Sequence, residues 1–134
     1  MIYAVVDTNV LVSALWTKNG QAATFRVVKL LQEGKFVPLY NEEILAEYEE
    51  VLSRPKFKFP RLAIDTIIAY MKEHGVHSER MPYDGQMPDE DDRVFYEVTL
   101  SKEDAFLVTG NQKHFPTTPI VVTPSEMLEI LLGD

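Results

Sequence analysis

The chain has 134 residues, with 21 acidic residues against 13 lysines and arginines and a formal net charge of −8. This length is typical of one domain, so we expect residues 1–134 to fold as a single unit. The absence of cysteine excludes disulfides, thiolate metal sites and a cysteine nucleophile. The acidic balance excludes a strongly basic nucleic-acid-binding protein. It does not exclude an enzyme whose acids hold divalent cations that contact phosphates.

No apolar run approaches the ~18 residues that a membrane-spanning helix requires, so no membrane association is expected. The N-terminus lacks a basic segment and reaches an acid at Asp7, which is unlike a signal peptide. The sequence therefore predicts a cytoplasmic protein.

Short apolar runs alternate with amphipathic helical patterns along the chain. Strands are predicted at residues 2–6, 36–39, 76–81, 105–109 and 119–123. Helices are predicted at residues 9–16, 20–33, 42–52, 62–72, 91–101 and 124–132. Residues 78–92 contain prolines, a glycine and several acids, and predict a connecting loop. This alternation is typical of an α/β sandwich with a mostly parallel sheet, whose ligands bind beyond the carboxyl ends of the strands.

Several residues are predicted to mark helix ends. Thr8 or Asn9 can cap the first helix, and Asn41 is a favourable N-cap for the third, which has two glutamates in its first turn. Pro124 suits the first turn of the last helix. Because large apolar residues are most often buried, we expect Trp16 in the core rather than at an interface.

Acids at three places along the chain are candidates for chemistry. Asp7 directly follows the first strand, where it either stands at the carboxyl edge of the sheet or caps the next helix. Glu47 and Glu49 flank the apolar stripe of the third helix, and the helical period does not choose between them or exclude a solvated role for both. The four acids at residues 89–92 exceed what a helix start requires and repel one another, which a nearby cation would relieve.

Two polar residues, Thr109 and Asn111, follow the fourth predicted strand, where they can form a turn or hold an acid or a water. A parallel α/β fold could gather Asp7, residues 89–92 and Asn111 on one rim. Oxygen donors without cysteine suit Mg²⁺ or Mn²⁺ better than zinc. The histidines, among them His114, lack the spacing of a zinc site and are expected at the surface or facing phosphate.

One basic cluster with interleaved aromatic residues is a candidate for contacting single-stranded RNA through its phosphates and bases. It consists of Arg54, Lys56, Phe57, Lys58, Phe59 and Arg61. The alternative is a solvated basic loop that contributes to solubility. Lys113, after the fourth strand, is a further candidate for a phosphate contact.

Four segments in order give the chain a resemblance to the PIN-domain family of metal-dependent ribonucleases, over essentially its whole length. They are residues 5–10 (Val-Val-Asp-Thr-Asn-Val), 42–56, 89–97 and 107–111. Within that family the chain looks most like the toxin components of bacterial toxin–antitoxin systems. The resemblance implies a three-layer α/β/α sandwich with a central, mostly parallel five-stranded sheet.

The same resemblance assigns roles to residues at the motif positions. The implied catalytic metal ligands are Asp7, Glu47 and Asp92, with Asp89 as a frequent companion. The implied supporting residues at the rim are Asn9, Thr109 and Asn111. Mg²⁺ or Mn²⁺ held there would activate a water for attack on an RNA phosphodiester. Many PIN domains carry an acid where this chain has Asn111, whose amide offers a carbonyl ligand but no charge.

Two other classes of function stay open. A receiver or haloacid-type phosphatase domain would also place an Asp after the first strand, but Asn9 stands where a phosphatase carries a second acid. A PIN-like domain that binds RNA or protein without cleaving RNA is favoured by Asn111 and by the acidic surface. For a toxin, the resemblance implies a homodimer and a cognate antitoxin whose basic segment enters the acidic site.

Overall fold

A computed structural model describes residues 1–133. The strands are β1 (Tyr3–Val6), β2 (Val37–Tyr40), β3 (Val76–His77), β4 (Phe106–Val108) and β5 (Val121–Val122). The α-helices are α1 (Thr8–Trp16), α2 (Ala23–Gln32), α3 (Glu42–Leu52), α4 (Arg61–His74), α5 (Arg93–Leu100) and α6 (Pro124–Leu132). Two short 3₁₀ helices are η1 (Glu90–Asp92) and η2 (Gln112–His114).

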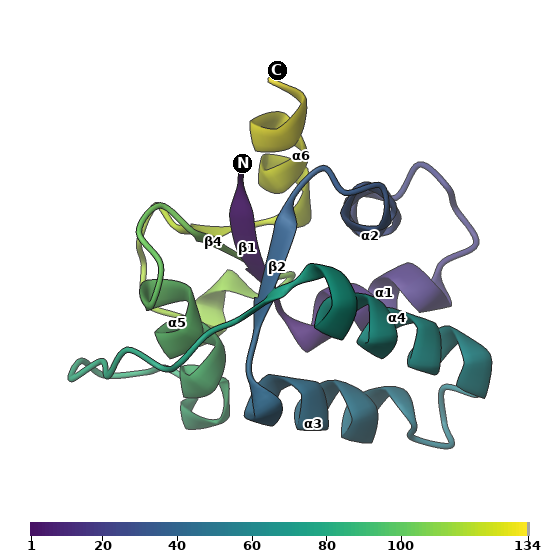
Figure 1. The fold of residues 1–134 in the computed structure, drawn as a ribbon, viewed down its shortest axis with the longest axis horizontal. Helices are drawn as coiled ribbons and strands as arrows, with labels where there is room; N and C mark the ends of the chain where they lie inside the picture. The colour runs from purple at the N-terminus through teal and green to yellow at the C-terminus, as the bar shows by residue number, and fades with distance from the viewer. Residues whose placement is uncertain (134) are drawn as a thin grey trace.

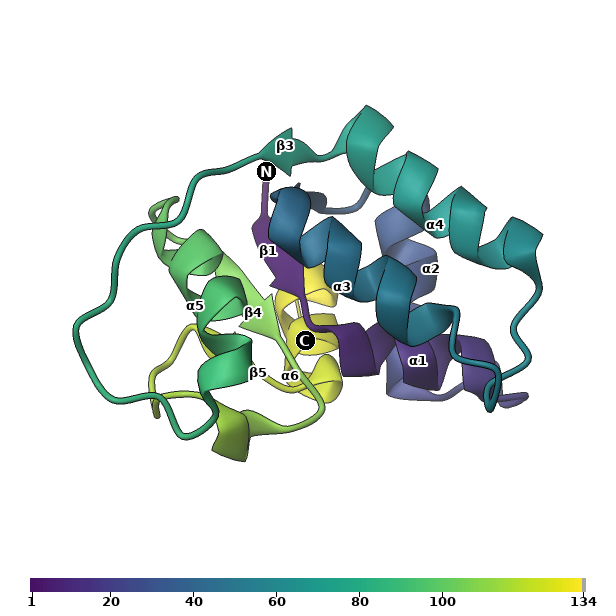
Figure 2. The same cartoon turned by 90° about the horizontal axis from the view of Figure 1, so that it is seen from below.

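All strands belong to one parallel sheet in the order β3-β2-β1-β4-β5. Figure 1 shows α5 on one side of the sheet and α1, α2 and α4 on the other, with α3 below the ends of β1 and β2. The view from below in Figure 2 agrees, with α3 nearest the viewer. The structure confirms the predicted α/β architecture with a central five-stranded sheet. No helix among the described residues is long and apolar enough to cross a membrane.

The central strand β1 is covered on both faces, which is why it reads as a continuous apolar run. Ala4, Val5 and Val6 are all at most 1% exposed. Tyr48 of α3 is also fully buried, and its hydroxyl donates a hydrogen bond to the Val6 carbonyl. This bond fastens α3 to the carboxyl end of β1, which matters because the next residue is Asp7.

The predicted helices agree with the structure more closely than the predicted strands do. Asn41 caps α3 as expected, because its side chain accepts a hydrogen bond from the Ile44 backbone N–H at 2.9 Å. β3 pairs over Val76 and His77 alone, far short of the predicted residues 76–81. The strand prediction was too long because β2 ends at Tyr40: the Ser78 N–H still donates to the Tyr40 carbonyl at 2.8 Å, but the residues after Ser78 have no strand to pair with.

Two predictions near the first helix are wrong. The N-cap position of α1 belongs to Asp7 rather than Thr8 or Asn9, and the Asp7 side chain makes no capping hydrogen bond. Trp16, expected in the core, is 59% exposed at the end of α1. Leu11 and Ala14 of the same helix are buried instead, so the local sequence pattern did not predict that Trp16 would be exposed.

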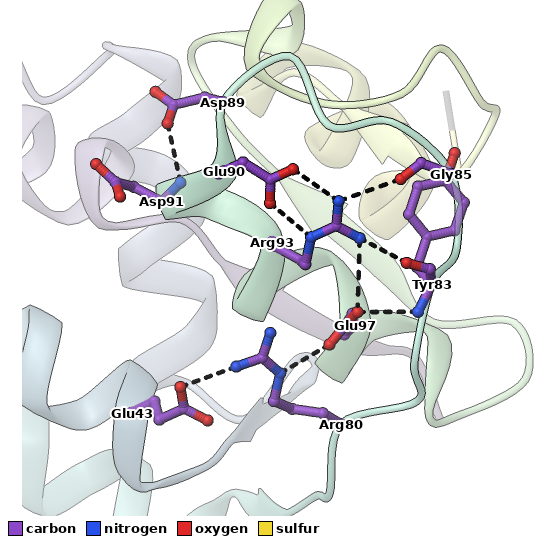
Figure 3. Close-up of polar contacts among 9 residues, drawn as sticks. All are labelled: Glu43, Arg80, Tyr83, Gly85, Asp89, Glu90, Asp91, Arg93 and Glu97. Carbon is purple, nitrogen blue, oxygen red and sulfur yellow. Dashed lines mark hydrogen bonds and ion pairs between the residues drawn. The ribbon is translucent and has the colours of Figure 1, made fainter.

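Glu97 of α5 ties down the loop of residues 78–92 (Figure 3). Its carboxylate is buried and accepts hydrogen bonds from the Arg80 Nε at 2.8 Å and the Tyr83 backbone N–H at 2.9 Å. Burial alone would raise the pKa of Glu97, but these donors outweigh it and the pKa lies below its ordinary value. Arg80 also pairs with the exposed Glu43 at 2.9 Å.

Arg93 completes this network from the first turn of α5. Its guanidinium donates to the backbone carbonyls of Tyr83 and Gly85, and pairs with Glu90 at 2.7 Å (Figure 3). The backbone of the loop is therefore held in place directly before Asp89 and the three acids of η1.

We predict that Glu97→Gln lowers the free energy of unfolding by about 1–3 kcal/mol, because it leaves Arg80 and Arg93 without their buried carboxylate. Urea denaturation measures this loss. The matched control is Glu43→Gln, which removes the exposed partner of the same arginine and should cost less than about 1 kcal/mol. Equal losses in the two variants would show that the loop does not depend on the buried pair.

Candidate metal centre

Asp7 lies at the carboxyl edge of the sheet, one residue beyond β1. Its carboxyl group is buried and uses Oδ2 to accept hydrogen bonds from the Thr109 hydroxyl at 2.8 Å and the Asn9 amide at 3.1 Å. Thr109 reaches this position because it follows β4, the strand paired with β1. Asp7 thus occupies the N-cap position of α1, but its side chain makes no capping hydrogen bond and lies instead at the sheet edge.

The Asp7 carboxylate lacks an Arg or Lys partner among residues 1–133. Burial is the main reason that its pKa rises to about 7, and the negative charges of Asp92 and Glu47 add to the effect. The hydrogen bond from Thr109 works in the opposite direction. With a pKa of about 7 the group is roughly half ionised at neutral pH, and the negative charge that it gains above pH 7 has no Arg or Lys partner in the described chain.

Glu47 and Glu49 lie on different sides of α3 and contact different residues. Glu47 is half-buried, accepts a hydrogen bond from the Thr8 hydroxyl and has a raised pKa, first through burial and then through the charge of Asp92. Glu49 is exposed and pairs with Arg61 at 2.7 Å. The structure thus places Glu47 beside the other acids of the site and Glu49 away from them, a choice that the helical period left open.

Asp92 and Asp89 meet at the start of α5, beside His114, which was expected at the surface or facing phosphate. His114 of η2 lies with Nδ1 at 3.0 Å from Asp92 Oδ2 and 3.5 Å from Asp89 Oδ2. The other ring nitrogen, Nε2, lies 2.8 Å from the Asn111 amide nitrogen. One ring nitrogen of His114 therefore contacts Asp92 and the other contacts Asn111, so the ring links η2 to the start of α5.

A sequence signal for His114 did exist. It stands three residues after Asn111, and a 3₁₀ helix has three residues per turn, so the two side chains share one side of η2. What the sequence did not contain was the position of η2 relative to η1. That position depends on how α5 and β4, which connect η1 to η2, pack in the fold.

The donor set fits a divalent cation. Asp89, Asp92 and His114 each offer one ligand atom, and these atoms lie within 4.8 Å of one another. The carboxylates of Asp7 and Glu47 are outside this closest group, yet the charge of Asp92 raises the pKa of both. Clustered carboxylate oxygens are suitable ligands for Mg²⁺ or Mn²⁺.

Asn9, Thr109 and Asn111 form a chain of hydrogen bonds next to Asp7. Besides binding Asp7, Asn9 accepts a hydrogen bond from the Gly110 N–H at 3.0 Å. Thr109 accepts one from the Asn111 N–H at 2.9 Å. These bonds couple the turn after β4 to the first turn of α1 and fix the direction of the Asp7 carboxylate.

The structure divides the basic residues that the sequence singled out. Arg54 pairs with Glu50 at 2.9 Å, and Arg61 pairs with Glu49 and Asp65. The candidates without an acidic partner within 4.0 Å, among the described residues, are Lys56, Lys58 and Lys113. The three lysines are therefore better placed to contact phosphates than the two arginines.

The fold and this acid-lined sheet edge define a PIN-like α/β protein. A family model described as "PIN domain" matches residues 3–113, and the chain belongs to the PIN-domain family. No curated protein and no solved structure matches the chain. The matched range includes Asp7, Glu47 and Asp92 and ends one residue before His114.

The raised pKa of Asp7 predicts how the metal-free protein responds to pH. Between about pH 4 and pH 7 the folded state binds a proton that the unfolded chain releases, so the free energy of unfolding falls as pH rises and levels off above 7. Asp7→Asn should remove part of this slope and stabilise the protein at pH 8 by about 2–4 kcal/mol.

Urea denaturation in EDTA at pH 5.5 and pH 8 measures both effects. Glu47 and Asp92 contribute slopes of the same sign, since their pKa values are also raised, so the variant keeps a smaller slope. Asp84→Asn, which changes an exposed acid of the 78–92 loop, serves as the control and should alter neither value. A less stable Asp7→Asn variant at pH 8 would show that the hydrogen bonds outweigh the buried charge.

Proposed function

We propose that this protein is a divalent-metal-dependent endoribonuclease in which Asp7, Glu47 and Asp92, with Asp89, hold the cation. The observation that carries the proposal is the convergence of these carboxylates at one sheet edge, where the pKa values of Asp7, Glu47 and Asp92 are raised and no Arg or Lys of the described residues pairs with them. PIN domains are generally nucleases, which sets the reaction class. The cation is Mg²⁺ or Mn²⁺.

A bound divalent cation supplies an activated water and neutralises charge on the phosphate under attack. The chain's own residues determine where it sits. Thr109 and Asn9 orient the Asp7 carboxylate, and the Thr8 hydroxyl orients Glu47. His114 orients Asp92 from the opposite side of the cluster. Each ligand is therefore held by a second residue, as preorganised metal sites require.

Cation binding should raise the melting temperature of the protein, because the cation binds the folded state and relieves repulsion among the carboxylates. Mn²⁺ at 100 times its Kd stabilises by about 2.7 kcal/mol. We expect Asp92→Asn to weaken Mn²⁺ binding by about tenfold or more. Asp91→Asn, which changes the exposed neighbouring acid, is the control and should weaken it far less. An unchanged melting temperature with Mn²⁺ would contradict the metal site.

RNA must also be held near these acids. We propose that Lys56, Lys58 and Lys113 contact its phosphates, because their ammonium groups have no acidic partner within the described chain. Arg54 contributes to this surface when RNA displaces its exposed partner, Glu50. Such contacts add affinity that falls with salt concentration.

The toxin assignment is part of the same proposal and rests on the resemblance of the four motifs. A cognate antitoxin would present a basic segment to the unbalanced carboxylates of the site, in place of the cation. The active protein would be a homodimer in the cytoplasm. Measurement of the molecular size in solution would test the homodimer. Capture of a basic peptide that competes with Mn²⁺ would test the antitoxin.

The test of the reaction itself compares cleavage of end-labelled single-stranded and structured RNA by EDTA-treated protein, with and without Mn²⁺ or Mg²⁺. We expect cleavage that requires the cation and falls by at least about 100-fold in Asp7→Asn and Glu47→Gln. Glu49→Gln is the matched control, because it changes an exposed acid two residues from Glu47, and should retain activity.

Folded protein that binds Mn²⁺ but cleaves none of these RNAs would instead favour a PIN-like domain that binds RNA or protein. Asn111, at a position that is often acidic in the family, is the feature that makes this second function worth testing. Wild-type activity in both Asp7→Asn and Glu47→Gln would refute the assigned ligands.

A further inference from the structure

Three aromatic side chains form a cluster where the end of α1 meets the loop between α3 and α4. Figure 2 shows these two backbone segments next to each other. The Phe57 and Phe59 rings stack with centroids 5.1 Å apart and planes 7° apart. Trp16 packs edge-to-face against both, with centroids at 5.6 Å and 6.2 Å. The cluster is ordered by its own packing, so its rings are held rigidly.

This cluster is not part of the core. Trp16 is 59% exposed, while Phe57 and Phe59 are half-buried. Trp16 and Phe57 form one end of an open hollow of about 470 Å³, which Val12, Ser13 and Thr17 also line. A rigid, exposed tryptophan beside a hollow of this size has room for a flat ring to stack on it.

The hollow leads directly to the acid cluster. Asn9 lines it at the other end and donates a hydrogen bond to Asp7. Asn9, Ser13 and Trp16 lie on one face of α1, since they are separated by four and three residues. From Asn9 to Trp16 the helix rises by about 10 Å, the length of about three stacked nucleotides at ~3.4 Å each.

Lysines adjoin the lining residues of the hollow in the sequence, although the protein is strongly acidic. The Lys56 ammonium lies 5.1 Å from the centroid of the Phe57 ring. In the sequence, Lys58 lies between Phe57 and Phe59, and Lys18 directly follows Thr17. None of these lysines has an acidic partner within 4.0 Å among residues 1–133. Aromatic faces with unpaired cations beside them complement unpaired bases and their phosphates.

We propose that the hollow between Asn9 and Trp16 is a subsite that stacks an unpaired base of single-stranded RNA on Trp16, a few nucleotides from the phosphate at the acid cluster. This assignment rests on the proposed nuclease function and adds a substrate class to it. A base inside a duplex has both faces covered by its neighbours and cannot stack on Trp16, so the subsite favours unpaired strands.

Trp16 is the sole tryptophan of the chain, so its fluorescence reports directly on the subsite. The titration uses wild-type protein in EDTA, where metal-dependent cleavage does not proceed. We expect hexaadenylate to quench Trp16 fluorescence, and a hexamer of abasic ribose phosphates with the same number of charges to leave it nearly unchanged. Equal quenching by the two, or none by hexaadenylate, would overturn the subsite.

A second measurement follows the anisotropy of fluorescein-labelled hexaadenylate. Trp16→Ala should weaken binding by roughly tenfold, whereas Trp16→Phe, which keeps a ring, should stay within about threefold of wild type. Phe25→Ala is the matched control, because Phe25 is a partly exposed aromatic of a different surface groove. Unchanged affinity in Trp16→Ala overturns the proposal and leaves the cluster to a protein partner.

These outcomes are separable from those of the cleavage test. Metal-dependent cleavage with no role for Trp16 in binding refutes the subsite and leaves the nuclease intact. Quenching by hexaadenylate together with weaker binding by Trp16→Ala, in protein that cleaves no RNA, supports the subsite and refutes the nuclease.

Discussion

The parallel pairing of β1 with β4 is the constraint on which the rest of the site depends. Val6 lies opposite Val108, and the Asp7 N–H donates to the Val108 carbonyl at 2.9 Å. The next side chains along the two strands, Asp7 and Thr109, therefore meet at the sheet edge. Because both strands are buried, a slip of one residue would move apolar side chains out of their packing, so the register is strongly specified.

This constraint concentrates negative charge in a place where the protein cannot easily neutralise it. Asp7 is buried, and Glu47 and Asp92 add their charges from α3 and the start of α5. Elsewhere on the surface, arginines pair with acids, as in the Arg61 pairs with Glu49 and Asp65. The folding free energy that the apo site loses is the free energy that a divalent cation can recover on binding.

The remaining contacts hold the ligands against this repulsion. Tyr48 fastens α3 to the end of β1, and the Glu97 network fixes the loop before η1. The surface at the far end of α1 is aromatic instead of acidic. Trp16 is exposed there, close to lysines that have no acidic partner among the described residues. One helix thus connects a carboxylate cluster suited to a cation and a phosphate with an aromatic surface suited to a base. In the inferred complex, the RNA strand therefore runs along α1 between these two surfaces.

The sequence by itself determined the order of the elements, the α/β class and the position of Asp7 after the first strand. These are local properties: apolar runs, the helical period and caps such as Asn41 lie within a few residues of one another. The resemblance to the PIN-domain family pointed to Glu47 and Asp92, although the helical period alone did not separate Glu47 from Glu49. Strand ends were predicted less well, because pairing depends on a partner strand and not on the run itself.

Only the tertiary structure decided which side chains share a surface. Thr8 and Glu47 are separated by 39 positions, and Asp7 and Thr109 by 102, yet each pair is joined by a hydrogen bond. His114 reached Asp92, and Trp16 reached Phe57, through the same long-range packing. No short segment of the sequence predicts these contacts. The order of the parallel strands and the path of the connections between them bring such distant residues together.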